Sequence, residues 1–222
     1  MGIKENIDRL RDRIKVVANR AGRQADPIEI VAACKGVKPE FIEEAISYGV
    51  RIVGENRIQE AHQKYDIIQN SAEWHMIGHL QTNKVKKALK IFSMIQSLDS
   101  IRLAQEINKR AKDTLDVLIE VNTSGELTKY GVRPEELIAF IEQVSKLPNI
   151  KVCGLMTIGP LRGDPRPSFR LLRKLKDKIE AKSIENVRMD WLSMGMTDDF
   201  EHAIEEGSNM LRIGRGIFGE RQ

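Results

Sequence analysis

Apolar positions follow two alternating patterns along the chain. Residues 3–22 place them at three- and four-residue spacing, which predicts an amphipathic helix. Beyond it, short apolar runs rich in β-branched residues alternate with further helical patterns, and each run predicts a buried strand. Strands are predicted at 29–35, 51–53, 74–77, 92–96, 115–121, 150–156, 189–194 and 210–214, and helices at 3–22, 39–48, 56–68, 82–90, 99–112, 134–146, 167–182 and 198–206.

Eight predicted strands, each followed by a helix or by the chain end, indicate an α/β protein of the (β/α)8 or TIM-barrel type. The helix at 3–22 precedes the first strand and is an extra N-terminal element. No linker or shift in composition separates a second unit, so residues 1–222 are expected to form a single domain. A doubly wound open sheet is the competitor, but residues 34–37 lack the glycine-rich fingerprint that would follow its first strand.

The composition restricts the class of protein, its compartment and its partners. Hydrophobic residues make up 41% and charged residues 31% of the 222 positions, as in a soluble globular protein. We find no signal peptide and no run of about 18 apolar residues, so no membrane partner is expected. Cys34 and Cys153 stand far apart and the four histidines form no metal motif, which suggests a reducing cytoplasm and no metal site. The net charge is only +4, and the Lys and Arg residues are interleaved with Asp and Glu. The lysines at 84–90 are expected to be a solvated helix face, so a nucleic-acid partner is not favoured.

Lys35 closes an apolar run at 28–34 and is predicted to lie at the carboxyl end of the first strand. On the period of two it shares a face with Val31 and Ala33. Because burial disfavours an ammonium, such a position lowers the pKa of a lysine from about 10.4 towards neutrality. The amine then becomes a nucleophile that can form a Schiff base with an aldehyde. The alternative is a lysine that extends to solvent and has no chemical role.

The carboxyl ends of barrel strands carry the functional side chains. Two loops at these ends, at 193–197 and 213–217, contain glycines that would let backbone N–H groups approach a phosphate. Arg215 could add charge there or point to solvent. The residues at or near the carboxyl ends of the predicted strands are therefore the candidates for the functional site: Lys35, Asn56, His75, Asn122, Met156, Ser193, Gly195, Arg212, Gly214 and Arg215.

Arg212 lies within an apolar strand, so it needs an acceptor inside the protein. A ring nitrogen of a bound heterocycle would serve, and the cation would keep that nitrogen unprotonated. A structural ion pair with a glutamate is the alternative.

The chain resembles the pyridoxal phosphate homeostasis proteins, relatives of the alanine racemase N-terminal barrel (PLP fold type III). The matching segments are VAACKGVKPEFIEEAISYGVRIVGENRIQEA (31–61), WHMIGHLQTNK (74–84), VNTSGELTKYGV (121–132), GLMTIG (154–159) and LSMGMTDDFEHAIEEGSNMLRIGRGIFGER (192–221). The resemblance implies pyridoxal 5′-phosphate (PLP) held as an internal aldimine on Lys35. It further implies phosphate contacts from the loop at 193–195 and from Gly214-Arg215, with Arg212 near the pyridine nitrogen and Asn56 near the ring. His75 is assigned to the surroundings of the cofactor.

One position departs from the family pattern. The family usually has serine or threonine where this chain has Arg215, so a hydroxyl contact to phosphate is missing. Only the backbone N–H or the guanidinium of Arg215 could replace that contact.

The resemblance implies a carrier or buffer of PLP, with apo-enzymes that use the cofactor as its recipients. An arginine at the pyridine nitrogen makes the ring a weak electron sink, and alanine racemases take their second acid/base from a further β domain that this chain lacks. We therefore expect no robust amino-acid turnover, and a monomer, because part of the racemase dimer surface is absent. A small PLP-dependent racemase is the main alternative. A Schiff-base aldolase and, from basicity alone, a nucleic-acid-binding protein are the others.

Overall fold

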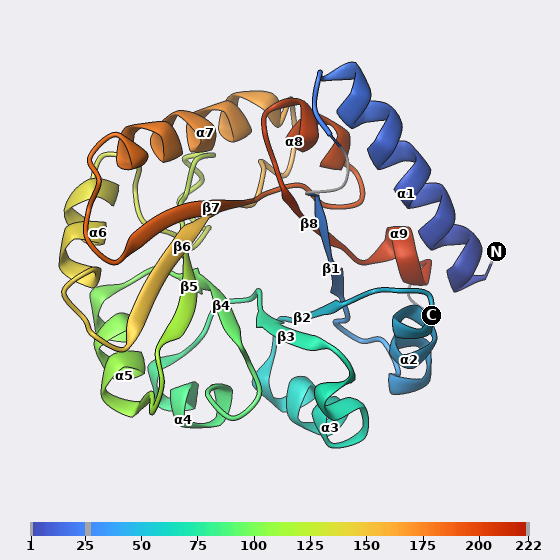
Figure 1. Ribbon diagram of the computed structural model, residues 1–222, viewed down its shortest axis with the longest axis horizontal. Coiled ribbons are helices and arrows are strands. Elements are labelled where there is room, and N and C mark those ends of the chain that lie inside the picture. The colour runs from blue at the N-terminus through green and yellow to red at the C-terminus, as the bar shows by residue number, and fades with distance from the viewer. Residues whose placement is uncertain (1, 25–27, 221–222) are drawn as a thin grey trace.

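The computed structural model describes residues 2–24 and 28–220, and its strands form a closed parallel barrel (Figure 1). The strands pair in chain order, and β1 closes the barrel against β8, with Val31 opposite Arg212. The predicted (β/α)8 barrel is confirmed. Its strands are β1 (Glu29–Ala33), β2 (Ile52–Glu55), β3 (Glu73–Met76), β4 (Met94–Leu98), β5 (Leu115–Glu120), β6 (Ile150–Met156), β7 (Val187–Ser193) and β8 (Met210–Ile213).

Helices surround the barrel, and the extra N-terminal helix fills a place in their ring. β8 is followed by the short α9, and α1 contacts α2, α8 and α9 beside it (Figure 1). The apolar stripe of α1 that the sequence predicts is buried in this position. The helices are α1 (Ile3–Arg20), α2 (Pro39–Ser47), α3 (Ile58–Ile68), α4 (Val85–Ala88), α5 (Ile101–Arg110), α6 (Leu137–Val144), α7 (Arg166–Glu180), α8 (Phe200–Glu205) and α9 (Arg215–Phe218), with 3-10 turns η1 (Gln69–Ser71) and η2 (Thr82–Lys84).

Several boundaries differ from the prediction by a few residues, and three differences concern the site. β1 ends at Ala33, so Lys35 lies in the following turn. β4 runs two residues later than predicted, because the N–H of Phe92 still bonds to the C=O of Ala88 while the buried polar pair Gln96 and Ser97 continues the strand. The short helix α9 was not predicted from the apolar pattern.

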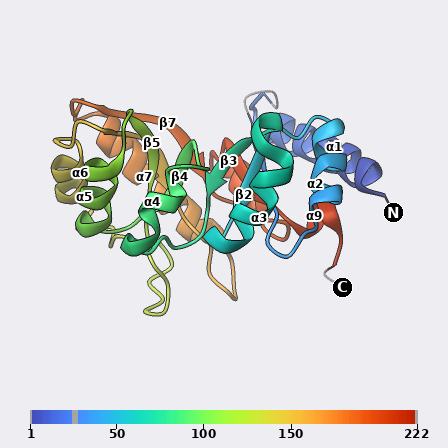
Figure 2. The same ribbon diagram turned by 90° about the horizontal axis from the view of Figure 1, so that it is seen from below.

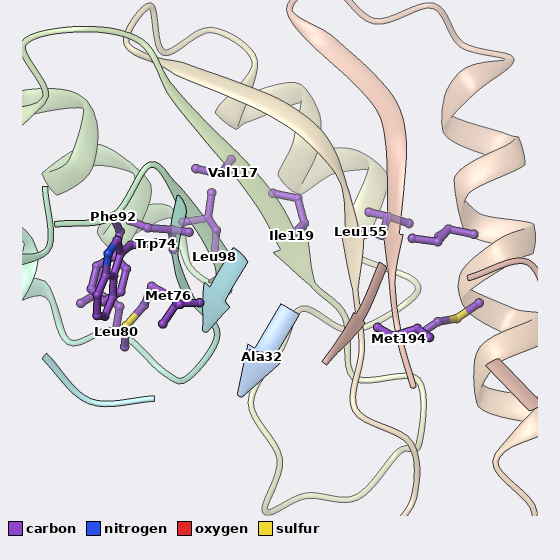
Figure 3. Close-up of a cluster of buried hydrophobic side chains, with 14 of the residues drawn as sticks. Ala32, Trp74, Met76, Leu80, Phe92, Leu98, Val117, Ile119, Leu155 and Met194 are labelled. Atoms are coloured by element: carbon purple, nitrogen blue, oxygen red, sulfur yellow. The ribbon is translucent and has the colours of Figure 1, made fainter. Parts of the chain in front are cut away.

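The core has two layers, separated by the barrel wall. Alternate residues of a strand face opposite sides, so Val31 belongs to the inner cluster and Ala32 to the outer one. The outer layer packs strands against helices and includes the labelled side chains of Figure 3. Met156 lies in the inner layer. The interior of the barrel is therefore filled, and ligands can only approach its ends.

The loops that follow β5 and β6 project beyond the rest of the barrel (Figure 2). They are tied together, since Lys129 Nζ donates a 2.5 Å hydrogen bond to the C=O of Gly159. Among the described residues, none of the helices combines the length and the apolar character that a membrane crossing requires.

Candidate functional site

Lys35 lies in a tight turn at the carboxyl end of β1. The N–H of Val37 bonds to the C=O of Cys34 at 2.9 Å, and Gly36 adopts a φ of +72°. Ala33 belongs to the inner cluster and lines the same pocket as Lys35. The side chain of Lys35 is half-buried, which is less burial than the sequence argument assumed.

That pocket, of about 360 Å³, also brings the last βα loop to the lysine. Gly214 and Arg215 line it, and a Cβ on Gly214 would lie 3.2 Å from the C=O of Ala33. The turn after β1 and the loop after β8 are therefore in contact. Residue 221, which ends the last segment that resembles the family, lies outside the described residues.

The two glycine-containing loops lie side by side. The N–H of Arg212 bonds to the C=O of Gly195 at 3.0 Å, and the N–H of Gly216 bonds to Thr197 Oγ1 at 3.1 Å. Within the described part of the chain, the N–H groups of Gly195, Gly214 and Arg215 have no hydrogen-bond partner. Free amides on adjoining loops are suited to an anion such as a phosphate.

Gly195 can hardly be replaced. Its φ is +96°, and an added Cβ would lie 2.6 Å from the Cβ of Ala203 on α8. The loop after β7 therefore lies directly against α8, which leaves backbone rather than side chains to meet a ligand.

The guanidinium of Arg215 is occupied elsewhere. It forms ion pairs with Asp198 and, at 3.2 Å, with Glu220, and its side chain is partly exposed. Of the two replacements for the missing hydroxyl, the backbone N–H is therefore the one free to act.

Arg212 is buried inside the barrel and makes two short hydrogen bonds. Nη1 donates to Ser193 Oγ at 2.6 Å, and Nη2 donates to the C=O of Thr157 at 2.7 Å. Neither acceptor is a carboxylate, so the alternative of a glutamate ion pair is not what the structure shows for this side chain. Burial lowers the pKa of Arg212 to about 10, with Glu120 and Asp199 opposing the shift, so the guanidinium stays charged at neutral pH.

A chain of hydrogen bonds links Arg212 to His75. Ser193 Oγ donates to Gln96 Oε1 at 2.6 Å, and Gln96 Nε2 lies 2.9 Å from His75 Nδ1. Because the amide nitrogen can only donate, Nδ1 accepts and the neutral ring carries its proton on Nε2. Burial lowers the pKa of His75 to about 4, so the ring is neutral at physiological pH.

The remaining candidates lie on separate elements. Asn56 directly follows β2 and is half-buried, with Gly78 packed so closely that an added Cβ would lie 2.6 Å from the C=O of Asn56. Met156 ends β6 inside the barrel. Asn122 shapes its own loop, because its Oδ1 accepts from the N–H of Gly125 at 3.0 Å.

Glu120, at the end of β5, is a site residue that the sequence reasoning missed. Burial raises its pKa to about 7, the charge of Asp99 adds to the shift, and Arg212 opposes it. Gln96 was also missed. Both are buried polar residues within strands, Glu120 at the end of β5 and Gln96 in the middle of β4, and a polar residue within an apolar run is the signal that singled out Arg212.

Changing Glu120 to glutamine should stabilise the protein relative to the wild type as the pH rises. The pKa of this carboxyl is raised from its ordinary value of 4.5 to about 7 by folding, so between these values only the unfolded chain ionises. The wild type should therefore lose roughly 1.5 kcal/mol of this contribution between about pH 4.5 and pH 6. Urea unfolding across this range measures it, with exposed Glu135→Gln as the control. A pH-independent difference would contradict the assignment.

Comparison with known proteins places these features in a family. The family model of the alanine racemase N-terminal domain matches residues 6–222. A pyridoxal phosphate homeostasis protein of Aquifex aeolicus is 47% identical over 229 residues, covering 100% of both chains. The human protein of that name is 37% identical and covers 100% of this chain and 87% of its own. The chain belongs to the pyridoxal phosphate homeostasis protein family.

A solved structure that is similar to this chain contains bound PLP. PipY of Synechococcus elongatus, with PLP bound, is 29% identical and superposes with a TM-score of 0.85, covering 98% of this chain and 100% of its own. The family assignment that the sequence motifs suggested is thereby confirmed.

Proposed function

We propose that this protein binds PLP at the carboxyl end of its barrel and acts in intracellular PLP homeostasis as a carrier or buffer. The observation that carries the proposal is the 47% identity, over the full length of both chains, to a protein named for this role. The PLP-bound structure of PipY supports the choice of cofactor.

The donor set fits PLP. The free amides of Gly195, Gly214 and Arg215 suit its phosphate, and Lys35 lines the same pocket as the last two. When bound, PLP supplies an aldehyde whose carbon joins a lysine nitrogen as C=N while its oxygen leaves as water. Arg212 has N–H groups beyond those given to Ser193 and Thr157, so we assign one to the pyridine nitrogen. Asn56, His75 and Met156 are assigned to the surroundings of the ring.

An arginine donor keeps the ring nitrogen unprotonated. A neutral ring is a weak electron sink, and this favours storage over chemistry at the α-carbon of an amino acid. We therefore propose no robust amino-acid turnover.

Changing Arg215 to threonine should tighten the binding of the phosphate group. The substitution keeps the backbone N–H, supplies a hydroxyl and removes a side chain that is paired with Asp198 and Glu220. One added neutral hydrogen bond predicts a dissociation constant lower by about two- to tenfold. Titration with pyridoxine 5′-phosphate, which lacks the aldehyde, measures it, and Arg215→Val, which has no hydroxyl, is the control. Equal effects of both substitutions would contradict the hydroxyl contact.

We further propose a cytoplasmic monomer that spans residues 1–222 as one domain. Cys34 and Cys153 are both free and buried, which agrees with a reducing compartment. The proposed partners are PLP and the apo-enzymes that receive it, without nucleic acid.

Transfer of the cofactor tests the function. The protein loaded with PLP, then freed of excess cofactor, is mixed with an apo-aminotransferase, and recovery of aminotransferase activity is followed. We expect recovery at a rate set by release from the carrier. In parallel, L-alanine and D-alanine in D₂O should show no catalysed α-proton exchange. Retention of PLP without any transfer, or multiple turnovers of α-proton exchange, would overturn the carrier proposal, and the second result would favour the racemase.

A further inference from the structure

The turn that carries Lys35 is held by two side chains of α3. Lys64 Nζ donates a 2.6 Å hydrogen bond to the C=O of Cys34, and Glu60 Oε2 accepts a 2.9 Å hydrogen bond from the N–H of Gly36. These two groups belong to the peptide bonds immediately before and after Lys35. Glu60 and Lys64 are four residues apart on the helix and lie 3.7 Å from each other, so they act from one helical face.

Lys64 is itself held by a buried charge. Its side chain is 8% exposed, and Nζ lies 2.5 Å from Oε1 of Glu55, which is fully buried at the end of β2. The second oxygen of Glu55 has no hydrogen-bond partner among the described residues. Burial of such a pair is costly, and apolar residues of similar size often stabilise a fold as well or better. Stability alone therefore explains the cluster poorly.

The direction of the Lys35 amine depends on its backbone. In the part of the chain that the structure describes, the Lys35 side chain has no hydrogen-bond partner, and the adjacent Gly36 is in the conformationally permissive left-handed region. A reacting amine must be held close to the geometry of attack, and small displacements are costly. Fixed peptide groups on both sides of Lys35 meet that requirement.

We propose that Lys64 and Glu60 are positioning residues for Lys35: they clamp its two peptide groups and so aim the amine at the PLP aldehyde. Glu55 holds Lys64 in place. The inference rests on the proposed function, because it concerns the capture of the aldehyde by Lys35.

The test separates covalent capture from phosphate binding. The variant Glu55→Gln/Lys64→Met removes both buried charges with little change in size, and Glu60→Gln weakens the second contact while keeping its shape. We expect the rate of PLP capture, trapped with borohydride, to fall about tenfold in the double variant. The dissociation constant of pyridoxine 5′-phosphate should stay within about twofold of the wild-type value. In the cofactor-free protein, the amide of Gly36 should exchange faster with D₂O in both variants.

Asp66→Asn, on the exposed side of the same helix, is the matched control and should change none of these quantities. Wild-type capture rates in both variants would overturn the clamp, as would equal losses of capture and of pyridoxine 5′-phosphate binding. If the double variant does not fold, the Glu60→Gln variant tests the clamp alone, through its rate of PLP capture and the D₂O exchange of the Gly36 amide. A wild-type protein that captures no PLP would instead overturn the proposed function.

Discussion

Replacing Lys35 with alanine should completely abolish the borohydride-stable attachment of PLP. Lys35 is the lysine whose turn meets the loop that carries the amides proposed to bind the phosphate, through the contact of Gly214 with Ala33. The variant should still bind pyridoxine 5′-phosphate within about threefold of the wild type, because the backbone amides and Arg212 remain. Mass spectrometry of the reduced protein measures the first quantity, and a binding titration measures the second.

Lys38 gives the matched control for this experiment. It is exposed, lines the same pocket and lies three residues further along the chain. Lys38→Ala should keep the full adduct. An adduct that survives in Lys35→Ala would show that another lysine reacts.

Replacing Arg212 with leucine should lower the free energy of unfolding by about 3 kcal/mol. The guanidinium donates to Ser193 Oγ and to the C=O of Thr157, and each hydrogen bond from a charged donor contributes about 1.5–3 kcal/mol. Release of a buried charge offsets part of this loss, since burial already lowers the pKa of Arg212. Urea denaturation at neutral pH measures the change.

The same variant should also weaken pyridoxine 5′-phosphate binding, because the donor assigned to the ring nitrogen is gone. Arg110→Gln removes only a surface ion pair within α5 and should change stability by less than about 1 kcal/mol. A loss below about 1 kcal/mol in Arg212→Leu would mean that the two hydrogen bonds contribute little. It would also remove the reason for giving Arg212 a central place in the site.

The barrel could be predicted because the sequence patterns that indicate its strands and helices are local. Apolar runs separated by helical patterns fix the order of strands and helices, and the period of two correctly placed Val31 and Ala33 on the inner face. The glycine-containing loops after β7 and β8 were visible for the same reason. Their unpartnered amides agree with the expected anion site.

The other features of the site could not be predicted, because they depend on contacts between segments that are distant in the sequence. Gln96 became a site residue only when the closed barrel brought Ser193, His75 and β4 together across its interior. The clamp on Lys35 likewise joins α3 to the turn after β1. Hydropathy also ended the predicted fourth strand at Gln96, two residues before β4 ends, because Gln96 and Ser97 are polar although both are buried. Sequence spacing cannot show which polar groups will satisfy one another.

Peptide mapping of the wild-type protein after loading with PLP and reduction with borohydride tests the central claim most directly. The account predicts one pyridoxyl group per chain, on the peptide that contains Lys35, together with loss of the yellow colour on reduction. A pyridoxyl group on a different lysine, or a protein that takes up no PLP at all, would contradict it.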